Sequence, residues 1–254
     1  MPPKGGFSFQ PFFIWPNFHS PIKSLFYLVD SIQKKNISDY LGQYVTDARR
    51  AKMEWVLSQR TRKIAIVLED IFQPQNASAV IRSCDCFGIQ DLHVVENRNK
   101  YNLNPDVELG SAQWISLRKY KGKEQNTAEC LDELKKNGYT LFATTPHEPD
   151  MMLNEIPLDG KVALLMGTEK TGLSEIAIEM ADYKVAIPMM GFTESFNISV
   201  SAALCMYSLR TRLNELKGWE LSEDEKTDLR LEWYKNTVKK SDRIIEEYLK
   251  RLKS

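Results

Sequence analysis

Cysteine and histidine are scarce in this chain. The sequence holds four cysteines, at positions 84, 86, 130 and 205, and three histidines. No two cysteines form a C-x-x-C pair, and no histidine stands near them at the spacing of a zinc site. A structural metal and a disulfide scaffold are therefore not expected. The apolar neighbours of these cysteines predict reduced thiols in the protein core.

Long apolar runs and an excess of one charge are also lacking. No stretch approaches the roughly 20 apolar residues that a membrane-spanning helix needs. Lys+Arg and Asp+Glu both total 34, so overall charge indicates no nucleic-acid partner unless basic side chains cluster. Residues 1–21 are rich in Phe and Trp, but prolines interrupt them and no small-residue cleavage site follows. We expect an aromatic-rich extension rather than a signal peptide, and a cytoplasmic protein.

Basic side chains do cluster in residues 22–62, which we predict to be a helical arm. The pattern favours helices over 22–36 and 38–62, with Ser38 or Thr46 as the N-cap. The stretch ARRAKMEWVLSQRTRK, which spans most of the second helix and the residue after it, contains Arg49, Arg50, Lys52, Arg60, Arg62 and Lys63. Such a cluster suits RNA phosphates, and it equally suits an ordinary solvated helix face. Charge alone does not separate these two interpretations.

Residues 63–215 show the pattern of an α/β domain. Uninterrupted apolar runs such as IAIVLED, DLHVVE, YTLFATTP, VALLMG and YKVAIPM alternate with segments of helical periodicity. Strands that are apolar on both faces are typical of a mostly parallel sheet with helices on both sides. Residues 216–254 are charged and helical in pattern. We therefore expect helical appendages at both ends of the α/β domain.

Three loops follow strands of this predicted sheet, where open α/β sheets bind their ligands. They are DIFQPQN, GTEKTG and PMMGFTES. The segment GTEKTGLS has the glycine spacing of a phosphate-binding P-loop, but Leu173 stands where that motif needs lysine. Lys170 lies on the wrong side of the second glycine. A P-loop is therefore rejected, and a turn whose backbone can approach a ligand remains, because Gly167 and Gly172 carry no Cβ.

The other two loops contain candidate polar residues. Arg82 lies in a helix that opens at Asn76, and it either faces a cleft or pairs on the surface with Asp85. Ser195 and Asn197 precede a long apolar helix, where such residues either cap the helix or hold a ligand. The residue types leave both pairs of alternatives open.

Taken together, these segments resemble the TrmH-like group of the SPOUT superfamily, the RNA 2′-O-ribose methyltransferases. The matching stretches are NASAVIRSCDCFG, LLMGTEKTGLS with DYKVAIPM, and GFTESFNISVSAA, in the family's order, with VTDARRAKMEWVLSQR resembling its N-terminal helix. The resemblance covers about residues 49–215. It implies a C-terminal trefoil knot, a homodimer, and S-adenosylmethionine as the cofactor. The long helix from Asn197, with Val200, Leu204, Tyr207 and Leu209, has enough apolar surface for dimerisation, and it could equally pack only within its own domain.

The resemblance also assigns roles to individual residues. Gly167, Ile187 and Phe196 match positions that hold the cofactor, largely through backbone groups, and Thr144 is a further match. Arg82 matches the catalytic arginine of the family. Asn76, Ser195 and Asn197 match polar residues of the same site, and Glu169 is expected to organise the pocket.

The implied activity is methylation of a tRNA guanosine 2′-hydroxyl, at the D-loop guanosine in position 18. The sequence contains no separate ribosomal-protein-like domain before the catalytic region, which favours tRNA over large-subunit rRNA. The same chemistry on rRNA or on another tRNA nucleotide remains an alternative. So does a non-catalytic RNA-binding protein of the same fold.

Overall fold

A computed structural model describes residues 31–123, 125–169 and 171–252. The aromatic-rich extension 1–21 lies outside these residues, as does most of the helix expected over 22–36. Within the described ranges, none of the helices is long and apolar enough to cross a membrane.

The central element is a parallel sheet of seven strands in the order β3-β2-β1-β6-β4-β7-β5. The strands are β1 Thr61–Glu69, β2 Ile89–Val95, β3 Ser116–Tyr120, β4 Tyr139–Thr144, β5 Met151–Met152, β6 Lys161–Met166 and β7 Tyr183–Ala186. The prediction of a mostly parallel sheet is confirmed. The sequence pattern missed β3 and β5 because these edge strands are short and partly exposed, so neither forms an apolar run.

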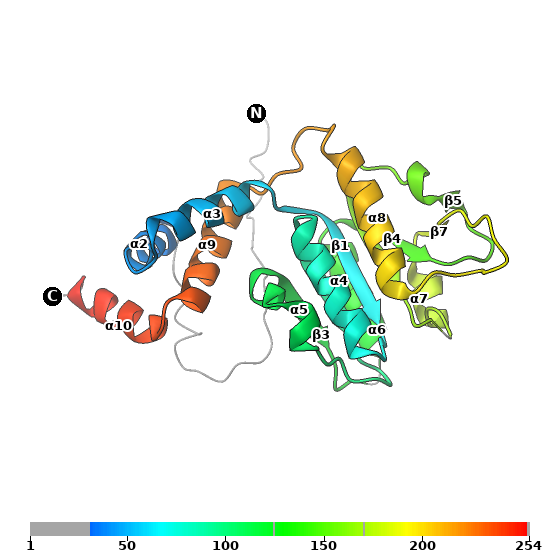
Figure 1. Cartoon of the computed structure of the whole chain (residues 1–254), viewed down its shortest axis with the longest axis horizontal. Coiled ribbons are helices and arrows are strands. Elements are labelled where there is room, and N and C mark those ends of the chain that lie inside the picture. The colour runs from blue at the N-terminus through cyan, green and yellow to red at the C-terminus, as the bar shows by residue number, and fades with distance from the viewer. Residues whose placement is uncertain (1–30, 124, 170, 253–254) are drawn as a thin grey trace, which may run out of the picture.

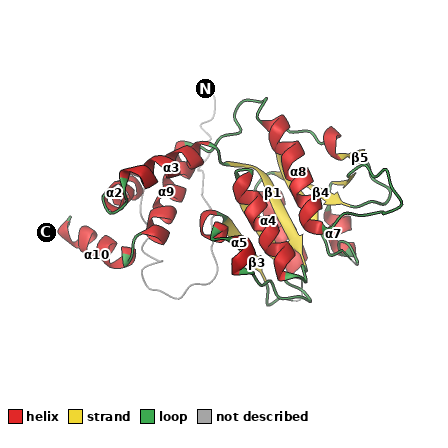
Figure 2. Cartoon of the chain, viewed as in Figure 1, coloured by secondary structure: helices red, strands yellow, loops and turns green. Residues whose placement is uncertain are grey.

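Helices cover both faces of the sheet (Figures 1 and 2). Ile64, Ile66 and Leu68 of β1 pack with α4 (Pro74–Cys86) and α8 (Ile198–Leu213). Ala65 and Val67, which point to the opposite face, pack with α6 (Asn126–Lys136) and α7 (Glu175–Met180). A short helix, α5 (Pro105–Glu108), and 3-10 turns at Ser111–Trp114 and Leu153–Glu155 complete the domain.

The helices before and after the sheet form one separate cluster. They are α2 (Ser31–Gly42), α3 (Asp47–Ser58), α9 (Glu223–Thr237) and α10 (Ser241–Arg251). Their apolar side chains, including Leu41, Leu57 and the fully buried Trp233, share a core apart from that of the sheet. Figure 1 shows this unit beside the sheet. Segments almost 200 residues apart in sequence are thereby joined, as in the ion pair between Lys34 and Asp228.

Several predicted boundaries and side-chain positions were wrong. The helix expected over 38–62 is interrupted after Gly42 and ends at Ser58, and the chain enters β1 at Thr61. Ser38 is buried inside α2, whereas Thr46 does cap α3 by accepting from the Arg49 N–H at 3.4 Å. Cys86 is exposed at the end of α4, while the other three cysteines are buried free thiols.

Candidate active site

Three loops meet at the carboxyl ends of the strands and place three predicted residues in one hydrogen-bond network. Asn76 lies in the first turn of α4, Glu169 follows β6, and Asn197 precedes α8. The Asn76 side-chain amide donates to Oε1 of Glu169. The Asn197 amide donates to Oδ1 of Asn76 at 3.1 Å and to Oε1 of Glu169 at 3.3 Å. Because each side chain bonds the other two, the network ties the three loops together.

Asn197 serves both functions that the sequence pattern left open. Its Oδ1 accepts from the N–H of Ser199 at 2.9 Å and from the Ser199 hydroxyl at 2.5 Å, which caps α8. Its side-chain nitrogen meanwhile joins the network with Asn76 and Glu169. Ser195 stands two residues earlier on an exposed loop, and no described residue hydrogen-bonds to its side chain.

Arg82 extends from α4 without an ion-pair partner. Its side chain is exposed, and no described residue forms a salt bridge or hydrogen bond with it. The alternative of a surface pair with Asp85 is wrong, because Asp85 pairs with Arg60 instead. The guanidinium therefore retains its five N–H donors for a ligand.

The GTEKTGLS segment folds back on itself. Thr168 and Gly172 exchange two backbone hydrogen bonds of 3.0 Å, and the hydroxyls of Thr168 and Thr171 lie 2.8 Å apart. A Cβ on Gly167 would lie 2.1 Å from the carbonyl carbon of Gly172, and Gly172 itself has φ +68°. The missing Cβ at Gly167 thus admits the loop's own backbone. A Cβ on Gly172, by contrast, would meet nothing within 4 Å, and the expectation that the backbone of this turn can approach a ligand stays a prediction.

Glu69 is a residue of the candidate site that the sequence reasoning missed. This last residue of β1 is 3% exposed. Its carboxylate accepts from the N–H and the hydroxyl of Ser174, both at 2.7 Å, and from the hydroxyl of Thr127 at 2.5 Å. The bonds to Ser174 anchor the end of the GTEKTGLS loop to the central strand. The sequence did contain a signal for this role, because Glu69 is an acidic residue at the end of the apolar run IAIVLE, and a buried charge needs partners.

Three of the four predicted cofactor residues lie at neighbouring strand ends. Thr144 ends β4, while Gly167 and Ile187 directly follow β6 and β7, the strands on either side of β4. The Thr144 hydroxyl donates to the carbonyl of Leu165 at 2.8 Å and keeps only its acceptor capacity. Phe196, the fourth, is exposed immediately before Asn197.

Two of the six predicted RNA contacts are internal, which corrects that prediction. Arg60 is fully buried, and Arg62 is 17% exposed and paired with Asp91. Burial lowers the pKa of the Arg60 guanidinium. Burial also acts to lower the pKa of Arg62, but the ion pair with Asp91 has the larger effect, and the pKa of Arg62 is raised. Neither side chain is free to reach a phosphate. The exposed basic residues of α3 are Arg49 and Lys52, with Arg50 partly exposed beside Asp47.

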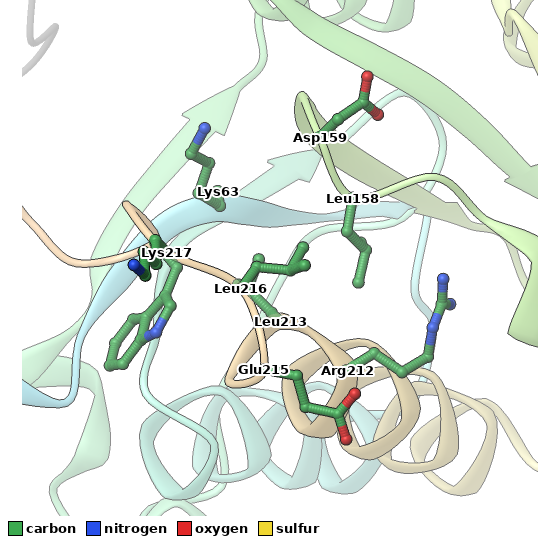
Figure 3. A pocket seen from close by; sticks show the side chains of 9 residues that line it. Lys63, Leu158, Asp159, Arg212, Leu213, Glu215, Leu216 and Lys217 are labelled. Atoms are coloured by element: carbon green, nitrogen blue, oxygen red, sulfur yellow. The ribbon is translucent and has the colours of Figure 1, made fainter.

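A pocket lies at the other edge of the sheet. It has a volume of about 560 Å³ and opens at the amino ends of β1 and β6 (Figure 3). Its lining residues are Lys63, Leu158, Asp159, Arg212, Leu213, Glu215, Leu216, Lys217 and Trp219. Because the network of Asn76, Glu169 and Asn197 lies at the carboxyl edge, this pocket is separate from that network. Lys63, predicted to contact RNA, is half-buried here.

Comparison with known proteins gives a consistent result. Residues 63–207 match the model of the SpoU rRNA Methylase family. A tRNA (guanosine(18)-2′-O)-methyltransferase of Borreliella burgdorferi is 47% identical over 78% of this chain and 90% of the relative. The protein of the same name from Thermus thermophilus is 34% identical over 64% of this chain and 81% of the relative.

Solved structures of similar proteins indicate the same family. The A. aeolicus TrmH/SpoU tRNA modifying enzyme is 26% identical and superimposes with a TM-score of 0.68 over 76% of this chain and 98% of that protein. AviRb of Streptomyces viridochromogenes, solved with AdoMet, has a TM-score of 0.55 over 63% of this chain and 64% of its own. At 22% identity, AviRb shows a common fold alone. The predicted resemblance is confirmed, and the chain belongs to the SpoU rRNA methylase family.

Proposed function

We propose that this protein transfers a methyl group from S-adenosylmethionine to the ribose 2′-hydroxyl of guanosine 18 in tRNA. The observation that carries the proposal is the hydrogen-bonded network of Asn76, Glu169 and Asn197, with Arg82 exposed on the helix that Asn76 opens and without an ion-pair partner among the described residues. The tRNA (guanosine(18)-2′-O)-methyltransferases of B. burgdorferi and T. thermophilus support the choice of substrate. Each is covered over most of its length by this chain.

The residues at the ends of β4, β6 and β7 fit the cofactor. Thr144, Gly167 and Ile187 offer neutral backbone groups and one hydroxyl, which suit the hydrogen-bonding edge of an adenine. Phe196 supplies an adjoining apolar surface. When bound there, S-adenosylmethionine supplies a methyl group that its sulfonium has already activated. The folded GTEKTGLS loop, held by Glu69, would shape one wall of this site.

Arg82 has the properties needed to align the target ribose. An arginine guanidinium stays protonated at neutral pH and binds phosphate with two parallel N–H donors. We assign Arg82 to orient the 2′-hydroxyl and a neighbouring phosphate toward the methyl group. We assign Ser195, which is exposed two residues before Asn197, to hydrogen-bond the ribose. Alignment of this kind lowers the barrier because the reacting groups no longer have to find their geometry.

The exposed basic side chains of α3 are proposed to bind the tRNA backbone. Arg49, Arg50 and Lys52 remain available for this, whereas Arg60 and Arg62 do not. The Arg49 guanidinium lies 5.7 Å from the ring centre of Trp114, and the Lys52 ammonium lies 4.1 Å from that of Trp55. Such aromatic neighbours hold the cations near the surface without neutralising them.

The proposal includes a homodimer, a C-terminal trefoil knot and a cytoplasmic location. The dimer is supported by Val200, Leu204 and Tyr207, which are exposed along one face of α8. Leu209, predicted for the same surface, is instead in the core. The knot is supported by the order of β6, β4 and β7 in the sheet and by the packing of α8 on α4, as in Figure 1.

Transfer of labelled methyl groups tests the proposal. The assay compares a tRNA transcript, the same transcript with guanosine 18 replaced, and an rRNA fragment. Label on guanosine 18 is expected with the wild-type protein and not with Arg82→Ala, although Arg82→Ala should still bind S-adenosylmethionine. Label on rRNA or at another tRNA position would show that the substrate is that RNA or that nucleotide instead. Binding of RNA with no transfer to any of them would indicate a non-catalytic protein.

A further inference from the structure

Arg60 occupies an unusual position for an arginine in this fold. Its side chain is fully buried where the helical unit joins the sheet, and its guanidinium lies 5.5 Å from the ring centre of Trp233. Asp85 is its ion-pair partner, and Nε and Nη1 have no hydrogen-bond partner among the described residues. A buried arginine with two unsatisfied nitrogens stabilises a fold poorly compared with an apolar side chain of similar size. Stability alone therefore does not account for Arg60.

The backbone around Arg60 is held firmly against the end of α4. The N–H of Thr61 donates to the carbonyl of Gly88 at 2.9 Å. Arg210 donates to the carbonyls of Phe87 at 3.1 Å and Gln59 at 3.0 Å. A Cβ on Gly88 would lie 2.3 Å from the Gln59 carbonyl oxygen, so these segments are in close contact. Arg60 is thus directed at one residue of α4, Asp85.

Asp85 lies three residues after Arg82 on the same helix. Side chains at this spacing are neighbours on a helix surface, and an arginine and an aspartate placed so attract each other. Arg82 is exposed and has no partner among the described residues, whereas Asp85 is turned toward Arg60. An ion pair with Asp85 would occupy the donors that Arg82 needs for RNA.

We propose that Arg60 is a positioning residue that holds Asp85 away from Arg82 and so keeps Arg82 unpaired for the substrate. Arg60 itself touches neither RNA nor cofactor. The inference rests on the role proposed above for Arg82. It also gives the helical unit a part in the reaction, because Arg60 connects Trp233 of that unit to α4.

Two substitutions that break the same ion pair separate this role from a structural one. Arg60→Met leaves the Asp85 carboxylate free to pair with Arg82, whereas Asp85→Asn removes it. We expect single-turnover methyl transfer, per folded protein at saturating tRNA and S-adenosylmethionine, to fall at least about tenfold in Arg60→Met. Asp85→Asn and the double variant Arg60→Met/Asp85→Asn should both stay within about threefold of wild type. Equal losses in Arg60→Met and in the double variant, or no loss in Arg60→Met, would overturn the proposal.

Cys86 provides a test that leaves the buried pair intact. It is exposed and lies four residues after Arg82, so Cys86→Glu offers Arg82 a surface carboxylate, and Cys86→Gln is the uncharged control. Slower transfer by Cys86→Glu than by Cys86→Gln is expected, and equal rates would refute the inference even if Arg60→Met failed to fold. Arg82→Ala reports on the proposed function separately, because full activity of that variant would remove Arg82 from the reaction altogether.

Discussion

Acidification should destabilise this protein through His93, a buried residue of β2. The pKa of His93 is lowered from 6.5 to about 4: burial is the main cause, Asp91 opposes it, and Arg118 and Arg62 act in the same direction as burial. His93 Nδ1 lies 3.0 Å from the Tyr120 hydroxyl, which gives its own proton to Glu133 at 3.0 Å. The neutral imidazole must therefore be the donor to Tyr120, so its proton is on Nδ1.

The size of the effect follows from the two pKa values. Between pH 6.5 and pH 4 the unfolded chain binds a proton that the folded chain rejects, so stability falls as the pH falls. With these values, His93 alone should lower the free energy of unfolding by about 2 kcal/mol between pH 7 and pH 5. The loss should reach roughly 3 kcal/mol near pH 4, where the folded protein begins to accept the proton.

Urea unfolding at pH 7 and pH 5 measures this loss. Other groups titrate in the same interval, so the comparison is with His93→Gln, which keeps a polar side chain and cannot gain a charge. The variant should lose about 2 kcal/mol less than wild type between the two pH values. His147→Gln is the matched control, because His147 is exposed, and it should behave as wild type. Equal losses in wild type and His93→Gln would refute the reasoning.

Three further predictions concern the candidate site and the basic helix. Gly167→Ala should raise the KM for S-adenosylmethionine at least about tenfold, because the added Cβ would overlap the Gly172 backbone. Gly160→Ala is the control and should match wild type, because a Cβ at Gly160 would meet open space. Glu69→Ala should cost about 3 kcal/mol of stability in urea unfolding, since the three donors that now bond to the buried carboxylate would lose their acceptor. A loss under about 1 kcal/mol, of the order of a single surface contact, would contradict the anchoring role of Glu69. Lys52→Gln should reduce the slope of log K for tRNA against log salt by roughly one, and an unchanged slope would remove α3 from the RNA interface.

Local pattern was sufficient for five of the seven strands. Parallel strands buried on both faces are apolar throughout, so β1, β2, β4, β6 and β7 can be recognised from composition. The need for glycine at position 167 and the cap at Asn197 depend on a few neighbouring residues and were also predictable. The edge strands β3 and β5 were not predictable in this way, because a short or polar strand resembles a loop in the sequence.

Tertiary structure decided which side chains meet. Asn76 and Asn197 are 121 residues apart in the chain, and their hydrogen bond exists only because α4 and α8 begin at the same edge of the sheet. Arg60 and Arg62 resemble their exposed neighbours in the basic arm until β1 carries them into the interior. Asp85 could pair with Arg82 on its own helix, yet it pairs with Arg60. Burial decides this choice, because a buried charge needs a partner more than an exposed one does.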